Sequence, residues 1–175
     1  QCIQKQKLIY FQKLANIDML TEAMNRNAYE NMIRYLDEQE LELHTTGVVL
    51  LDLDNLKEIN DNFGHEKGDE ALKLCYQCIR QAFQSEQNCF RIGGDEFAYI
   101  FHKDEKALIA DKLHKLELLL NEKDQDLSYS LSVSSGYAYY QPDTDMDFKD
   151  IVRRSDTMLY REKLRKKISH SASSH

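Results

Sequence analysis

Proline and glycine are scarce in this chain of 175 residues, and no hydrophobic run is long enough to cross a membrane. One proline and six glycines leave little room for linkers or low-complexity segments, and the sequence contains no internal repeat. The longest strongly apolar run is Gly47–Leu51, far shorter than the roughly 20 residues of a transmembrane helix. The length therefore predicts one domain with a full-sized hydrophobic core, and we expect it to lie in the cytoplasm.

An excess of positive charge is also missing. Lys and Arg total 23 residues against 30 Asp and Glu, which gives a formal net charge of −7. This balance argues against non-specific binding to nucleic acid as the main task. Near the C-terminus, however, five cations fall within seven residues: Arg161, Lys163, Arg165, Lys166 and Lys167. Such a cluster is typical of a solvated helix face, but a ligand that carries phosphate groups would also require it.

Cysteine occurs four times, at Cys2, Cys75, Cys78 and Cys89. Cys75 and Cys78 form a C-x-x-C pair, which is compatible with a zinc or redox site. A structural zinc site needs four ligands, however, and no second C-x-x-C or His pair completes them. The pair lies within a helical pattern of hydrophobic residues, so we favour reduced thiols on a helix.

Hydrophobic periodicity predicts helices and strands that alternate along the chain. We expect helices at 1–17, 22–41, 68–83, 104–122 and 147–166, a short helix between Asn55 and Asn62, and strands at 47–53, 89–92, 97–101 and 127–139. Asp18 or Thr21 is expected to cap the helix at 22–41. Two glycines between apolar runs, at Gly93 and Gly94, indicate a β-hairpin in the middle of the chain. This order favours an α+β fold, with helices packed on a mixed or antiparallel sheet.

Residues 1–17 predict a polar helix with apolar positions at Ile3, Tyr10, Leu14 and Ile17. That spacing suits the end of a coiled coil that enters from an upstream module. A loose surface helix is equally compatible with it, because two heptads are too few to decide. Since the chain begins with glutamine rather than Met, we expect it to be part of a longer protein.

Acidic residues gather at two predicted strand ends. Asp52 and Asp54 lie two residues apart at the end of a buried strand, so they point to the same face. Carboxylates there are costly unless they meet a cation or hydrogen-bond donors. Asp95 and Glu96 lie at the hairpin tip. Acids from two adjacent strands are a common way to hold Mg²⁺ against a triphosphate, although solvated turn acids and helix caps explain the same residues.

The segment Arg91–Phe97, RIGGDEF, resembles the signature of the GGDEF family of bacterial diguanylate cyclases. Residues 18–26, DMLTEAMNR, resemble the family's entry segment, and residues 52–69, DLDNLKEINDNFGHEKGD, resemble its longest motif. Residues 134–136 and 156–163 resemble its two later motifs. The motifs stand in the family's order and cover nearly everything from residue 18 to residue 167.

The resemblance implies a five-stranded sheet surrounded by helices, as in class III adenylate cyclases and the polymerase palm. It divides the chain into a signalling helix at 1–17, a catalytic domain at 18–168 and a disordered tail at 169–175. The implied reaction condenses two GTP into cyclic di-GMP and two pyrophosphates, with Mg²⁺ or Mn²⁺ as cofactor. Each 3′-hydroxyl attacks the other GTP, so a homodimer is required for catalysis. The resemblance also implies an upstream sensory module in the full-length protein. The alternative is a GTP-binding regulatory module without turnover.

The resemblance also assigns roles to individual residues. Asp52, Asp95 and Glu96 are the implied catalytic residues, and the metal ligands are these three and the carbonyl of Leu53. The implied substrate-binding residues are Asn60, Asp69, Asn55, Leu56, Lys163, Lys167, Gly94 and His65. Among them, Asn60 and Asp69 match the positions that recognise the guanine edge, and Lys163 and Lys167 match those that grip the triphosphate.

Three departures from the family's pattern stand out. Lys167 replaces the usual arginine, which keeps the charge but loses the planar guanidinium. Lys166 replaces the usual glycine. Asn55 and Leu56 stand where aromatic residues are usual. The product-inhibition motif R-x-x-D would fall at Gln84–Gln87, which has neither the arginine nor the aspartate.

Overall fold

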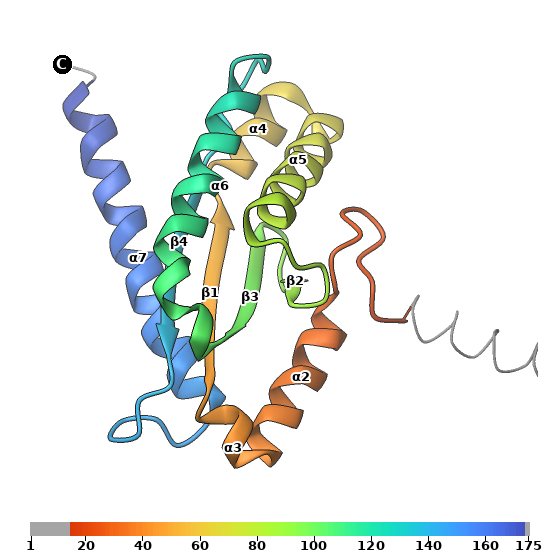
Figure 1. Ribbon diagram of the computed structural model, residues 1–175. Coiled ribbons are helices and arrows are strands. Elements are labelled where there is room, and N and C mark those ends of the chain that lie inside the picture. Colours follow the sequence, from red (N-terminus) through yellow and green to blue (C-terminus); the bar gives the residue numbers. More distant parts are fainter. Residues whose placement is uncertain (1–14, 174–175) are drawn as a thin grey trace, which may run out of the picture.

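The computed structural model describes residues 15–173, with side chains up to Ser169 (Figure 1). Its helices are α2 (Arg26–Glu38), α3 (Glu40–Leu43), α4 (Leu56–Phe63), α5 (His65–Phe83), the 3₁₀ helix η1 (Lys103–Leu108), α6 (Ile109–Asp124) and α7 (Phe148–Ser173). Its strands are β1 (Thr46–Leu53), β2 (Cys89–Arg91), β3 (Glu96–His102) and β4 (Val133–Tyr139). The helix expected at 1–17 falls almost entirely outside the described residues.

The strands form one four-stranded sheet in the order β2-β3-β1-β4. Every neighbouring pair is antiparallel, and β1 lies between β3 and β4, where Leu50 is opposite Ala98 on one side and Gly136 on the other. All eight residues of β1 are buried, as its nearly continuous hydrophobic run predicts. The predicted α+β fold with an antiparallel sheet and a central hairpin is confirmed.

Helices cover both faces of this sheet. Val49 and Leu51 of β1 belong to the hydrophobic cluster under α5 and α6, whereas Val48 and Leu50 belong to the cluster under α2 and α7. Figure 1 shows α6 and α7 on opposite sides of β1 and β4. Because side chains alternate along a strand, Asp52 continues the Val48–Leu50 face and points toward α7.

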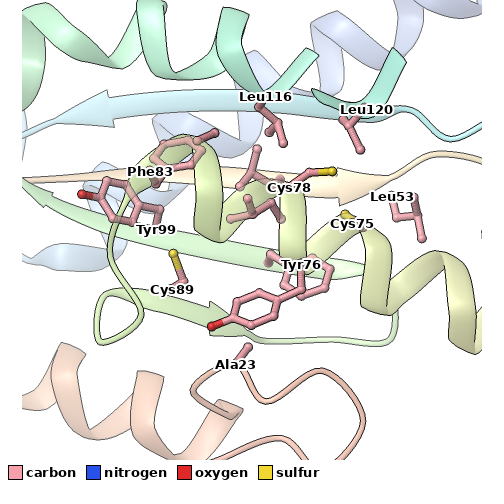
Figure 2. Close-up of a cluster of buried hydrophobic side chains, with 14 of the residues drawn as sticks. Ala23, Leu53, Cys75, Tyr76, Cys78, Phe83, Cys89, Tyr99, Leu116 and Leu120 are labelled. Atoms are coloured by element: carbon pink, nitrogen blue, oxygen red, sulfur yellow. The ribbon is translucent and has the colours of Figure 1, made fainter. Parts of the chain in front are cut away.

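The cysteines of α5 and β2 lie inside the core. Figure 2 shows Cys75, Cys78 and Cys89 among buried aromatic and aliphatic side chains. Burial raises the pKa of the Cys78 thiol to about 11 and that of Cys89 to about 12. These groups stay protonated at neutral pH, so the interpretation of the C-x-x-C as part of a core helix is confirmed. Cys2 falls outside the described residues.

The sheet has four strands where five were expected, because two segments do not pair. The strand predicted at 127–139 begins only at Val133. Before it, Tyr129 and Leu131 turn into the hydrophobic core, and the Leu131 amide donates to the Asp124 carboxylate at 2.6 Å. Beside β2, Met24 forms a single parallel bridge to Phe90, and α2 starts two residues later.

Helix boundaries also differ from the predictions. The helix expected at 22–41 begins at Arg26, because Asn25 is its N-cap and accepts a hydrogen bond from the Ala28 amide. Helix α5 begins at His65, three residues before the predicted start. Helix α7 runs to Ser173, into the segment 169–175 that was expected to be disordered, because neither glycine nor proline interrupts it.

Asp18 and Thr21, the expected caps, instead connect the entry segment to the hairpin. The Asp18 carboxylate accepts hydrogen bonds from the Thr21 amide at 2.9 Å, the Thr21 hydroxyl at 2.7 Å and Arg91 Nη1 at 3.0 Å. Arg91 also donates from Nη2 to the carbonyl of Gly94 at 2.8 Å. The network therefore fixes the hairpin tip relative to the segment that leads into α2.

This network predicts a pH-dependent stability. Burial raises the pKa of Asp18, but the hydrogen bonds from Thr21 and the charge of Arg91 outweigh it, so the pKa falls below its ordinary value of 3.8. A carboxyl with a lowered pKa in the folded state stabilises the fold above its unfolded pKa, and the stabilisation disappears as the pH falls through its folded pKa. Asp18→Asn should lower the free energy of unfolding by about 1–2 kcal/mol at pH 7.

Urea denaturation of wild type and Asp18→Asn between pH 7 and pH 3 measures this difference. We expect the difference to shrink below about pH 4, where the carboxyl becomes protonated. The matched control is Asp126→Asn, which changes an exposed aspartate and should leave the stability unchanged at every pH. A difference that stays constant with pH would contradict the role of the Asp18 charge.

Candidate active site

A cleft of about 280 Å³ opens where β1 ends, between the start of α4 and the C-terminal half of α7. Seven of the residues assigned from the sequence line it: Asp52, Leu53, Asn55, Leu56, Asp95, Lys163 and Lys167. Four further residues complete the lining: Asp54, Lys57, Ser132 and Lys166. The cleft therefore brings together three of the predicted acids, the predicted phosphate-binding turn and three lysines of the basic cluster.

Asp52 is the buried acid of this cleft, with only 6% of the residue exposed. It is opposite Glu96 of β3, and the Asp95 carbonyl accepts a hydrogen bond from the Leu53 amide at 2.9 Å. Lys163 Nζ lies 2.7 Å from Asp52 Oδ2. Burial raises the pKa of the Asp52 carboxyl above its ordinary value, although Lys163 acts against this, and the negative charge of Asp95 raises it further. A cation beside Asp52 therefore relieves an unfavourable charge.

Asp54 has a different environment. Its Oδ1 accepts a hydrogen bond from the Ser134 hydroxyl at 2.7 Å, and its Oδ2 accepts one from the Ser132 hydroxyl at 2.8 Å. Lys166 Nζ lies 2.7 Å from the same Oδ2. Protein donors thus reach both oxygens of Asp54, which makes this carboxylate a structural neighbour of the cleft rather than a candidate metal ligand.

The turn after Asp54 leads directly into α4. Asn55 has φ 60° and ψ 22°, in the left-handed region that asparagine tolerates better than most residues. It is followed by Leu56, the first residue of an eight-residue helix whose N-cap makes no side-chain hydrogen bond. The first N–H groups of this helix therefore face the cleft with their partial positive charge, which suits a phosphate.

Five predicted residues lie outside the lining of the cleft: Asn60, Asp69, His65, Gly94 and Glu96. Asn60 lies on α4 and its side chain packs against Gly68 of α5, so that a Cβ at Gly68 would overlap the Asn60 side-chain oxygen. Asp69 follows Gly68 directly. Helices α4 and α5 thus bring the two residues assigned to guanine recognition close together, beside the cleft.

The donor set of the cleft fits a magnesium ion. Mg²⁺ prefers oxygen ligands and usually takes only one or two carboxylates, with phosphate oxygens and water completing its shell. Asp52, Asp95 and the carbonyl of Leu53 are oxygen donors of this kind. Within residues 15–169, no group of three or more His, Cys, Asp or Glu side chains is assembled for a metal. Lys163 provides the positive charge beside Asp52.

Four lining residues were not assigned as site residues from the sequence: Asp54, Lys57, Lys166 and Ser132. Lys166 belongs to the basic cluster and lies three residues after Lys163, so the helical period could have placed both on the face of α7 that meets β1. Ser132 lies one strand repeat before Ser134, which could have placed both hydroxyls on the side of Asp54. That Ser132 and Ser134 lie beside Asp54 depends on the pairing of the start of β4 with the end of β1, which the sequence alone does not give.

Residues 15–169 match the family model described as "Diguanylate cyclase, GGDEF domain". The chain belongs to the GGDEF family. Among solved structures, it resembles the coiled coil and GGDEF domain of DgcB from Caulobacter crescentus in complex with c-di-GMP. The TM-score is 0.80 and the identity 25%, over 91% of this chain and 86% of that one.

Curated relatives of this GGDEF domain include enzymes with opposite activities. The probable diguanylate cyclase DgcF of Escherichia coli K12 is 35% identical over 156 residues, which cover 85% of this chain and 49% of that protein. The cyclic di-GMP phosphodiesterase PdeR of the same organism is 32% identical over 152 residues, which cover 86% of this chain and 23% of that protein. The chain thus spans half or less of the length of these relatives.

No helix within the described residues is long and apolar enough to span a membrane.

Proposed function

We propose that this GGDEF domain is a diguanylate cyclase, which condenses two GTP into cyclic di-GMP and releases two pyrophosphates. The observation that carries the proposal is the buried Asp52 carboxylate, which shares one cleft with Asp95, the start of α4 and the lysines of α7. This combination supports the proposal, because oxygen donors that suit a metal lie beside cationic and N–H groups that suit a triphosphate. The GGDEF family model and the curated diguanylate cyclases support the same activity.

Asp52, the carbonyl of Leu53 and Asp95 would hold Mg²⁺, or Mn²⁺ in its place. When bound, the metal favours the 3′-oxygen as a nucleophile and offsets the charge that develops on the α-phosphoryl group and the leaving pyrophosphate. Glu96 starts β3 beside Asp95 and is exposed, so it is available to accept the proton of the attacking 3′-hydroxyl or to assist a second metal.

The triphosphate would lie between α4 and α7. The N–H groups that follow Asn55 would bind the terminal phosphates, and Lys163 and Lys167, four residues apart on one face of α7, would contact the phosphate oxygens. In this structure Lys163 contacts Asp52. With a metal held by Asp52, Lys163 would be available to contact the triphosphate instead. The proposed substrate-binding set also includes Gly94 and His65, which lie outside the lining of the cleft.

The guanine base would be recognised by Asn60 and Asp69. The Asp69 carboxylate accepts hydrogen bonds from the N1–H and the amino group of guanine, a pair of donors that adenine does not present in that pattern. Each domain would bind one GTP in this way. The 3′-hydroxyl of each GTP attacks the α-phosphate of the other, so two copies of the domain must face each other. In the full-length protein, we propose that an upstream sensory module controls this assembly.

A second candidate is a regulatory GGDEF domain that binds GTP without turnover. The similarity to PdeR, whose name is that of a phosphodiesterase, favours it. Its weakness is that Asp52, Asp95 and Glu96 are all present in this chain. The two candidates differ in one measurable property, which is the formation of product from GTP.

Product analysis after incubation with GTP and Mg²⁺ tests the proposed function. We expect one cyclic di-GMP for every two pyrophosphates. Asp52→Asn and Asp95→Asn should each lower the rate by about a hundredfold or more, because each removes a charged metal ligand. Asp126→Asn, an exposed control, should keep the wild-type rate. GTP binding without product would favour the regulatory candidate, and near-normal turnover in either metal-ligand variant would refute the assigned site.

Gly68→Ala tests guanine recognition without a large change in stability. The new methyl group would displace the flexible end of the Asn60 side chain, while alanine is the better helix former by about 1 kcal/mol. We expect the melting temperature to stay within a few degrees of wild type and the preference for GTP over ATP to fall about tenfold. Asn60→Ala should give the same loss. An unchanged GTP preference in both variants would show that Asn60 does not contact the base.

A further inference from the structure

Lys166 connects α7 to the end of β1 and to the start of β4. Its Nζ lies 2.7 Å from Asp54 Oδ2 at the end of β1 and donates to the carbonyl of Val133, the first residue of β4, at 2.7 Å. It also lies 3.8 Å from Glu162 on the preceding turn of α7, and Glu162 in turn accepts the amide hydrogen of Ser135 at 2.8 Å. These contacts hold the C-terminal half of α7 against the beginning of β4.

We propose that Lys166 is a positioning residue for the triphosphate, and that it acts through Asp54. This inference rests on the proposed function, since it concerns the same cleft. Asp54 immediately precedes the Asn55–Leu56 turn, and the Asp54 amide donates to the carbonyl of Ser132 at 2.9 Å. By holding the Asp54 carboxylate, Lys166 fixes the orientation of the turn whose N–H groups receive the phosphates.

The two ion pairs between α7 and β1 differ in what surrounds the acid. Asp52 meets Lys163 beside the candidate metal ligands, and a metal can replace that lysine. Asp54, in contrast, receives two serine hydroxyls as well as Lys166, and all of these donors belong to the scaffold. In the proposed mechanism, the pair of Lys163 with Asp52 would open for a metal, whereas the pair of Lys166 with Asp54 would persist.

The positive charge of Lys166 is a second reason to expect that this residue favours triphosphate binding. Asp54 lines the cleft with only 13% of its side chain exposed, so its negative charge is poorly screened from a bound triphosphate. The ammonium of Lys166 neutralises this charge at the point where repulsion would be strongest. The motif that this segment resembles has glycine at this position, so this contribution is not part of that motif.

A double-mutant cycle between Lys166 and Asp54 tests the inference. The ligand is the non-cleavable analogue α,β-methylene-GTP with Mg²⁺, and its dissociation constant is measured by calorimetry. Lys166→Met should weaken binding about tenfold, because it leaves the charge of Asp54 uncompensated. Lys166→Arg should restore binding to within about threefold of wild type, since it keeps the charge. Lys149→Met, which removes an exposed lysine from the first turn of α7, is the matched control and should bind like wild type.

The decisive variant combines Lys166→Met with Asp54→Asn. If Lys166 acts through Asp54, the double variant binds no more weakly than Lys166→Met alone. Losses that multiply would show that Lys166 contacts the triphosphate directly, and an unchanged affinity in Lys166→Met would show that it has no role; either result overturns the inference. If Lys166→Met fails to fold, the double variant is compared with Asp54→Asn instead, because it leaves no uncompensated charge at this point. Binding by the double variant within about threefold of Asp54→Asn supports the inference. A further tenfold loss of affinity overturns it.

Binding of the analogue is measured without turnover, so this test does not depend on the cyclase activity. A wild-type chain that binds the analogue but forms no cyclic di-GMP would refute the proposed function and leave the double-mutant cycle interpretable.

Discussion

A single buried carboxylate, that of Asp52, sets the requirements that the rest of the cleft meets. It lies at the end of the central strand, where burial is nearly complete and where an uncompensated negative charge is costly. Burial raises its pKa, and Lys163 reaches it from α7 to supply the opposing charge. A protein selected for stability alone would place an apolar residue here, as at Val48–Leu51 and Leu53 of the same strand. The retained charge supports the proposal that this carboxylate binds a metal ion.

The position of α7 determines whether its lysines can reach the two acids. The helix crosses β4 so closely at Gly136 that a Cβ there would overlap the backbone of Ser155 and Leu159. The Ser155 hydroxyl also donates to the Gly136 carbonyl at 2.7 Å. This close approach lets Lys163 span the distance to the end of β1. The packing of α7 on β4 at Gly136 thus brings the lysine side chains of α7 to the cleft.

Local sequence patterns predicted most of the architecture and only part of the site. The run at β1 and the hairpin carrying Asp95 were predictable because burial and turn chemistry leave short-range signals. The resemblance to GGDEF domains then supplied roles that spacing alone left open. The partnership of Asp18 with Arg91 was missed, because it joins residues 73 positions apart and a nearby helix offered a simpler use for Asp18. Lys166 was missed for a similar reason, since its partner Asp54 lies 112 positions away.

The central claim is that Lys163 compensates the negative charge of Asp52 in the free protein and that a metal ion compensates it when the substrate binds. The most direct measurement is a crystal structure of the chain with α,β-methylene-GTP and Mg²⁺. The account predicts a magnesium ion bound by the carboxylates of Asp52 and Asp95, with the Lys163 ammonium bonded to a phosphate oxygen. A structure in which Lys163 remains on Asp52 while the metal and the triphosphate lie elsewhere would contradict it.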